Sequence, residues 1–158
     1  MASVYIETTI PSFYHETRQG PAPATWRHVT RTWWEKYRGG YHLVTSSAVH
    51  AELMVAPRAK AEQAFALIAG IPLLEESPGL IEVAEYHIEH RLMPVEAGGD
   101  AVHLAYASWH NIDYLLTWNC KHLANMNKIQ HLEVLNGRLG LHVPLITTPL
   151  TLMPEESK

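Results

Sequence analysis

The 158-residue chain has few cysteines, no long apolar run and no surplus of positive charge. Its single cysteine, Cys120, excludes an internal disulfide, and the absence of a CxxC pair excludes a zinc ribbon. No apolar run approaches the roughly 20 residues that a membrane-spanning helix needs, and the N-terminus lacks a basic region followed by a long apolar stretch. We therefore expect a soluble, unprocessed protein in the reducing cytoplasm, with no membrane partner.

The net charge of −4 argues against a protein that coats nucleic acid through bulk electrostatics. A nuclease is still compatible with this charge, because bound metal ions and a local basic rim can hold phosphates on an acidic protein. More often, basic residues of this kind only form the solvated face of a helix. The candidates for a basic rim are Arg18, Arg27, Arg31, Lys36 and Arg38.

A composition of 47% hydrophobic and 18% charged residues fits one globular domain with a substantial core. We assign the domain to residues 1–150 and a C-terminal tail to residues 151–158. The sequence contains no internal repeat, long linker or low-complexity tract.

Short segments rich in β-branched and aromatic residues alternate with segments of helical periodicity. Pro21 and Pro23 are typical of a loop, and Ser46 or Ser47 is a plausible N-cap. The expected strands are 3–10, 41–45, 71–74, 114–117 and 145–148. The expected helices are 24–38, 48–54, 59–69, 78–92, 100–110 and the stretch from Asn119 to residue 140. This alternation favours an α/β fold, a three-layer α/β/α sandwich with a central parallel sheet.

Four oxygen-bearing side chains lie where predicted strands end or the following helices begin: Glu7, Glu52, Asp100 and Asn119. Taken singly, each has an ordinary explanation, as a solvated charge or as a helix cap such as Asp100 or Asn119. Because the carboxyl ends of parallel strands meet at one edge of a sheet, we expect the four to lie together. A cluster of hard oxygens predicts a Mg²⁺ or Mn²⁺ site.

The motifs VYIETTIPS, AVHAEL, GDAVHLAYA and DYLLTWNCKHL, in this order and spacing, resemble the PIN domain family, whose nucleases include the toxins of VapBC-type toxin-antitoxin pairs. The resemblance covers nearly the whole chain. The family pattern has Asp at the first position and usually at the fourth. Here Glu7 keeps the charge on a longer side chain, and Asn119 keeps an oxygen but loses the charge.

The resemblance implies metal-assisted hydrolysis of RNA phosphodiester bonds. Glu7, Glu52 and Asp100 would hold one or two ions that activate water, and Asn119 would be a weaker ligand or would position that water. The longer Glu7 favours the more tolerant Mn²⁺, and the neutral Asn119 weakens a second metal site.

Residues beside these four are further candidates. Thr8 and Thr117 could donate hydrogen bonds to a ligand carboxylate or to the scissile phosphate. Lys121 and His122 could contact a phosphate at the start of the helix expected after Asn119. Cys120 is more safely interpreted as a small buried residue than as a catalytic nucleophile.

Histidines and tryptophans supply two more hypotheses. His87 and His90 lack the HExxH spacing of a zinc site. His103, one helical turn beyond Asp100, is either a partner of the acids or, more commonly for such a residue, a core histidine. An aromatic patch on one helix predicts a surface for dimerisation or antitoxin binding. The patch comprises Trp26, Trp33, Trp34 and Tyr37.

The leading hypothesis is a Mg²⁺- or Mn²⁺-dependent endoribonuclease, the toxin of a toxin-antitoxin pair, with RNA as substrate, a cognate antitoxin as partner and a homodimeric assembly. The alternative is a PIN-fold module that binds RNA or protein and whose Glu7 and Asn119 no longer support turnover. A third hypothesis is a metal-dependent phosphoesterase for small molecules. The sequence does not name the RNA, the cleavage site, the number of metal ions or the antitoxin.

Overall fold

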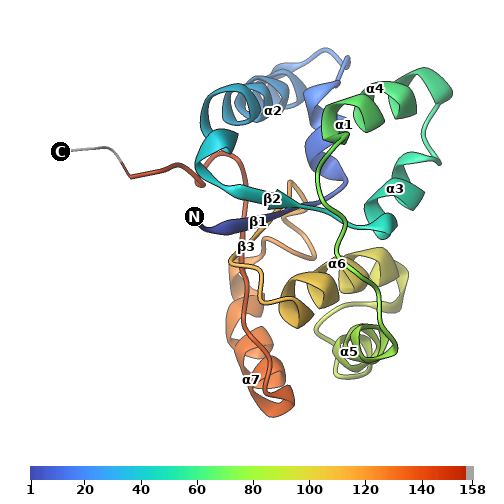
Figure 1. Ribbon diagram of the computed structural model, residues 1–158, viewed down its shortest axis with the longest axis vertical. Helices are drawn as coiled ribbons and strands as arrows, with labels where there is room; N and C mark the ends of the chain where they lie inside the picture. The colour runs from blue at the N-terminus through green and yellow to red at the C-terminus, as the bar shows by residue number, and fades with distance from the viewer. Residues whose placement is uncertain (156–158) are drawn as a thin grey trace.

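A central parallel sheet of four strands organises the computed structural model, which describes residues 1–155 (Figure 1). Its strand order is β2-β1-β3-β4, and all three pairings are parallel. The strands are β1 Ser3–Ile6, β2 His42–Val44, β3 Tyr114–Leu116 and β4 Leu145–Thr147. The expected strand 71–74 contributes only one isolated bridge, between Leu73 and Thr45.

Helices cover both faces of this sheet. Figure 1 shows α1, α2 and α4 on one side and α5, α6 and α7 on the other, so the predicted three-layer sandwich is confirmed. The helices are α1 Thr9–Tyr14, α2 Pro21–Thr32, α3 Ser47–Leu53, α4 Arg58–Ile68, α5 Pro78–Glu89, α6 Gly98–Trp109 and α7 Ile129–Leu139. Shorter helical turns are η1 Trp33–Tyr37, η2 Arg38–Gly40, η3 Val95–Ala97 and η4 Met126–Lys128. Within residues 1–155, no helix is long and apolar enough to cross a membrane.

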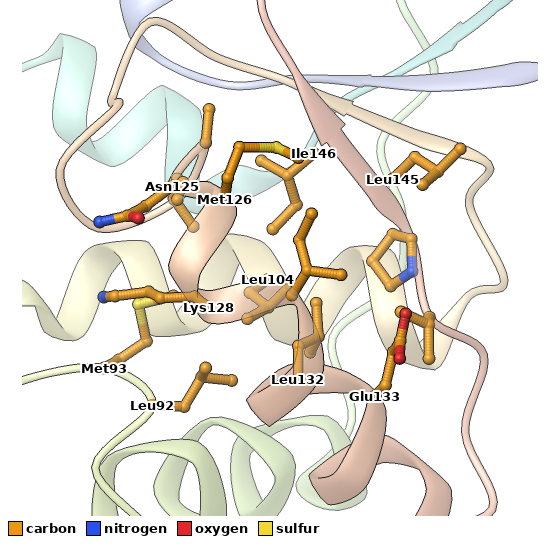
Figure 2. Close-up of a pocket in the computed structure, with 15 residues that line it drawn as sticks. Leu92, Met93, Leu104, Asn125, Met126, Lys128, Leu132, Glu133, Leu145 and Ile146 are labelled. Carbon is orange, nitrogen blue, oxygen red and sulfur yellow. The ribbon is translucent and has the colours of Figure 1, made fainter.

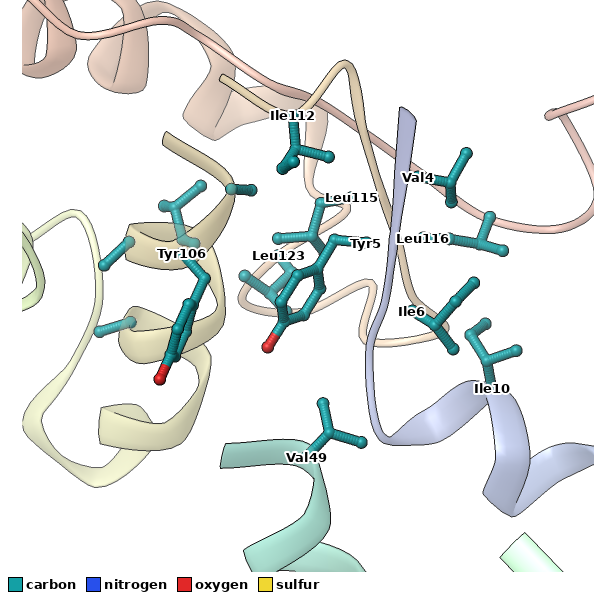
Figure 3. Packing of buried hydrophobic residues seen from close by; sticks show 14 of the residues in the cluster. Val4, Tyr5, Ile6, Ile10, Val49, Tyr106, Ile112, Leu115, Leu116 and Leu123 are labelled. Atoms are coloured by element: carbon teal, nitrogen blue, oxygen red, sulfur yellow. The ribbon is translucent and has the colours of Figure 1, made fainter. Parts of the chain in front are cut away.

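The two central strands are apolar on both faces, as helices on both sides of a parallel sheet require. Figure 3 shows Tyr5 of β1 on the side of Tyr106 from α6, whereas Val4 and Ile6 point the other way. All four side chains are buried. This packing fixes the positions of β1 and β3, and therefore where the residues that follow these strands lie.

Two prolines open helices instead of ending strands or forming loops. The first strand ends at Ile6 rather than residue 10, and Pro11 is the third residue of α1. Pro21 is the first residue of α2. The first-turn N–H groups of a helix have no intrahelical acceptor, so proline is tolerated there. The predicted strand end at Pro11 and the predicted loop at Pro21 were therefore wrong.

The helix predicted directly after Asn119 is also wrong, because α7 begins only at Ile129. Asn119 Oδ1 accepts a hydrogen bond from the backbone N–H of His122 at 3.0 Å, and Asn125 Oδ1 accepts one from Asn127 N at 3.0 Å. Such bonds from Asn side chains to nearby backbone compete with helix formation. They hold residues 119–125 in turns.

The predicted aromatic patch is corrected by the burial of Trp33 and Trp34, which are both in the core. Trp33 Nε1 donates to the carbonyl oxygen of Leu152 at 2.7 Å, so the indole N–H has an internal partner. Leu152 lies within the expected tail and is itself buried. Residues 156–158 of that tail lie outside the described residues. Trp33 and Trp34 therefore form no exposed surface for a partner.

Candidate functional site

The residues that follow β1 and β3 meet at the carboxyl edge of the sheet. Ile6 pairs with Leu116 in register, so Glu7 and Thr117 occupy the next positions on neighbouring strands. Glu7 N donates to the carbonyl oxygen of Leu116 at 3.2 Å, and Thr117 Oγ1 donates to Glu7 Oε2 at 2.8 Å. The parallel register itself thus brings together residues that are 110 positions apart.

Glu7 is 2% exposed, so it is not the solvated surface charge that was its ordinary explanation. Thr9 donates to the carboxylate through its backbone N–H at 3.0 Å and through its hydroxyl at 2.9 Å, in addition to the bond from Thr117. Burial raises the pKa of Glu7, although the charge of His103 and these hydrogen bonds oppose the rise. The carboxylate is therefore held inward by the strand ends.

Glu52 projects from α3 toward the same edge and stays partly exposed. Its Oε1 lies 2.8 Å from His103 Nε2, and its Oε2 accepts a hydrogen bond from Thr8 Oγ1 at 2.5 Å. Burial alone would raise its pKa, but the contact with His103 outweighs burial and lowers it. A Cβ on Gly99 would lie 2.7 Å from Glu52 Oε1, so a larger residue where α6 passes this carboxylate would displace the end of the Glu52 side chain.

Asp100 is the third residue of α6, which begins at Gly98, so it is not the N-cap of this helix, the ordinary alternative to a ligand. Its Oδ2 accepts a hydrogen bond from Asn119 Nδ2 at 2.9 Å. Burial raises the pKa of Asp100, and the negative charge of Glu52 adds to the rise, whereas His103, His122 and Asn119 oppose it. Asp100 and Glu52 are thus close enough for their charges to repel.

His103 joins the acids into one group, here named the sheet-edge cluster: Glu7, Glu52, Asp100, Asn119 and His103. The imidazole is fully buried. Beside its contact with Glu52, His103 Nδ1 lies 2.7 Å from the hydroxyl of Tyr5, which lies 2.7 Å from Ser46 Oγ. Burial would lower the pKa of His103, but the hydrogen bond to Glu52 and the charges of the three carboxylates raise it.

The structure therefore brings all four predicted oxygen-bearing side chains to one edge, with a histidine among them. Sequence reasoning named His103 only as one of two alternatives and did not find Tyr5, Ser46, Thr9 or Gly99. One signal was present in the sequence: Tyr5 and Glu7 alternate in the same strand and so point to the same side.

The neighbouring candidates are placed as follows. Thr8 and Thr117 each donate a hydrogen bond to a carboxylate of the cluster, and Thr117 is buried behind Glu7. Lys121 is exposed and His122 is partly exposed, in a turn that is not a helix start. Cys120 is exposed rather than buried, because the turn carries it outward.

The donor set suits a hard divalent cation, since Glu52 and Asp100 offer carboxylates. Asn119 turns its amide nitrogen toward Asp100 and its oxygen toward the backbone N–H of His122, so its oxygen would join the set only after the amide turns over. Glu52 adds a repulsive charge beside Asp100, and a cation held between the two carboxylates would offset this charge together with His103. Among residues 1–155, no three acidic, histidine or cysteine side chains already stand in a metal-holding group. The oxygens of Glu7 are turned to Thr9 and Thr117.

A separate pocket lies beside α7 and shares no residue with the sheet-edge cluster. Figure 2 shows Leu104, Leu132 and Ile146 around it, and its volume is about 70 Å³. Its lining is mainly apolar, with Lys128 and Glu133 among the few charged side chains. The pocket offers no constellation for phosphate chemistry, so the candidate site remains the cluster.

Comparison with known proteins supports the fold. Neither the protein-family models nor the curated proteins give a match to this chain. A chain in the crystal structure of VapBC2 from Rickettsia felis bound to a DNA fragment from their promoter matches with a TM-score of 0.52, over 92% of this chain and 98% of that one. The two sequences are 10% identical, so the likeness shows the fold alone. The fold expected from the PIN resemblance is confirmed.

Proposed function

We propose that this protein is an endoribonuclease that needs Mg²⁺ or Mn²⁺ and acts in the cytoplasm as the toxin of a toxin-antitoxin pair. The observation that supports this most is the buried imidazole of His103, which lies 2.8 Å from Glu52 and whose pKa is raised by the charges of Glu7, Glu52 and Asp100. The fold is like that of a VapBC2 chain, and the carboxyl edge of such a parallel sheet is where we expect the three acids to act.

Glu52, Asp100 and Asn119 would hold the ion, and Glu7 would join them by leaving its hydrogen bonds to Thr9 and Thr117. The bound ion would supply Lewis acidity for hydrolysis of a phosphodiester. His103 and Thr8 hold the two oxygens of Glu52, so this carboxylate is oriented before an ion arrives. Lys121 and His122, on the turn after Asn119, would contact the RNA phosphates.

The proposal of an antitoxin partner is supported by the fold comparison, since the matched structure is a VapBC2 assembly on promoter DNA. A homodimer stays a prediction, but Trp33 and Trp34 cannot be its interface because they are buried. Light scattering of the isolated chain measures this assembly.

The test is incubation of purified protein with single-stranded and structured RNA, with and without Mn²⁺. We expect cleavage in Mn²⁺ that Asp100→Ala reduces by about 100-fold or more, because several kcal/mol of charge stabilisation are lost. Asp113→Ala is the matched control, since Asp113 is an exposed acid at the opposite end of β3, bound to Ser3.

Equal cleavage by the wild type and Asp100→Ala would identify a contaminant and refute the nuclease. Saturable RNA binding without cleavage would favour the alternative, a PIN-fold binding module in which Glu7 and Asn119 no longer support turnover.

A further inference from the structure

Three aromatic side chains stack next to the sheet-edge cluster. Trp26 of α2 lies parallel to Trp118, with ring centroids 5.2 Å apart and an interplanar angle of 7°. Phe13 of α1 meets Trp26 edge-on at 5.2 Å. Trp118 Nε1 donates to Thr30 Oγ1 at 2.7 Å, which fixes the inner ring. Trp118 is 7% exposed, whereas Trp26 is 37% exposed. The stack therefore ends in an indole that solvent reaches.

The stack is tied directly to the acids. Trp118 immediately precedes Asn119, and its backbone N–H donates to Thr9 Oγ1 at 2.8 Å. The same Thr9 hydroxyl donates to Glu7. Phe13 lies one helical turn beyond Thr9 on α1. A polymer bound at the acids would therefore lie close to the aromatic stack, which α1 and α2 carry.

This part of the chain is basic although the protein is acidic. Residues 11–40 carry five Arg and Lys against two Glu, whereas the rest of the chain carries seven against fourteen acids. The Arg18 guanidinium lies 6.0 Å from the centre of the Phe13 ring. Arg27 Nη1 donates to the carbonyl oxygen of Glu16 at 3.1 Å. Each guanidinium has five N–H donors, so donors remain for further acceptors.

One acid offsets part of this charge. Arg18 holds the Glu16 carboxylate at 2.9 Å, and these hydrogen bonds lower the pKa of Glu16 to about 2. Arg27 has no carboxylate partner among the ion pairs of residues 1–155. The positive surplus of residues 11–40 therefore persists beside Trp26.

We propose that Trp26 is a stacking platform for a base of single-stranded RNA, with Arg18 and Arg27 holding the adjacent phosphates. Taking RNA as the ligand rests on the proposed function. An exposed aromatic face beside cationic groups is the combination that binds single strands with little sequence preference. A double strand would keep its bases in the helix, so the platform selects unpaired RNA. It also gives an acidic protein a local means of holding a polyanion.

The first test is fluorescence anisotropy of a labelled single-stranded oligoribonucleotide with the full chain in EDTA, where metal-dependent cleavage is prevented. We expect Trp26→Ala to weaken binding by about tenfold or more, because base stacking on an aromatic ring contributes about 1–3 kcal/mol. Trp26→Phe should keep part of the affinity. Trp109→Ala is the matched control, since Trp109 is 40% exposed and lies at the end of α6.

Equal affinity of the wild type and Trp26→Ala, or an equal loss in Trp109→Ala, would overturn the platform. A surface that instead serves a protein partner would give this same result. A second test needs no variant: the wild type should bind a strand with abasic positions more weakly than the intact strand. Equal binding of both strands would also overturn the proposal.

The outcomes separate the platform from the nuclease. Binding that depends on Trp26, without cleavage in Mn²⁺, would refute the nuclease and support the platform. Cleavage in Mn²⁺ with binding that ignores Trp26 would refute the platform and support the nuclease.

Discussion

Two buried histidines, His103 in the sheet-edge cluster and His87 on α5, differ in what faces their rings. His103 has a partner at each ring nitrogen. His87 Nε2 pairs with Asn136 Oδ1 at 2.7 Å, but its Nδ1 has no partner within residues 1–155. Burial lowers the pKa of His87, whereas three nearby carboxylates overcome burial and raise the pKa of His103. Carboxylate neighbours, not depth, distinguish the two.

The surroundings of His87 and His103 also differ in charge: His87 lies in a neutral hydrogen-bond network, and His103 lies among carboxylates. Asn136 Nδ2 donates to Ser108 Oγ at 3.0 Å and to the carbonyl oxygen of His142 at 2.8 Å, so one amide links α5, α6 and α7. Such a buried neutral network stabilises and specifies helix packing. The sheet-edge cluster instead gathers like charges, which costs stability and is expected at functional sites.

The largest expected effect on stability is that of Asn136→Ala in the neutral network. We expect the free energy of unfolding to fall by about 3 kcal/mol, because the change leaves His87 and Ser108 without partners in the core. Urea unfolding measures this loss, and cleavage by the protein that remains folded should be unchanged. A loss below about 1 kcal/mol would show that the network contributes little.

His103→Gln tests the difference between the two histidines at the sheet-edge cluster. We expect Mn²⁺ affinity or RNA cleavage to fall about 10- to 100-fold, because groups that orient metal ligands have effects of this size. His87→Gln is the buried control and should alter stability without altering Mn²⁺ affinity. If both variants bound Mn²⁺ like the wild type, the distinction between the two histidines would fail.

Asn119→Asp adds a fourth acid and removes the hydrogen bond from Asn119 to Asp100. In EDTA, we expect the variant to lose about 1–2 kcal/mol of stability, since repulsion replaces a partly buried bond. Mn²⁺ should restore the lost stability by binding the folded state. Thermal unfolding in EDTA and in Mn²⁺ tests both statements. An unchanged melting temperature in EDTA would contradict the first.

The smallest expected effect is the pH dependence that His87 contributes. The unfolded chain protonates this histidine near pH 6.5, but the folded chain resists because its pKa is lowered by burial. Stability from His87 is therefore complete above about pH 6.5 and decreases as the pH falls toward the lowered value. Urea unfolding between pH 7.5 and about 5 should show a weaker pH dependence in His87→Leu. The same slope in both proteins would exclude this contribution.

Much of the fold followed from sequence pattern. Parallel strands were expected because buried apolar segments alternate with helices, and their carboxyl ends gathered Glu7, Glu52, Asp100 and Asn119 as topology requires. The strand at 71–74 reduced to one bridge because short apolar runs do not determine pairing.

The remainder depended on contacts that span the chain. The inward carboxylate of Glu7 needs Thr117, and the place of His103 needs Tyr5 and Glu52, each about 50 or more positions away in sequence. The buried N–H of Trp33 is satisfied by the carbonyl oxygen of Leu152, which is also distant in sequence. Local periodicity cannot show such partners, and it therefore led to the prediction that Trp33 lies in an exposed patch.

Calorimetric titration of the metal-free chain with Mn²⁺ tests the sheet-edge cluster most directly. We predict that the wild type binds one ion per chain well, that a second ion binds weakly, and that Glu52→Gln and Asp100→Asn each remove the strong site. Wild-type binding retained in both variants, or RNA cleavage that persists in EDTA, would contradict the metal centre.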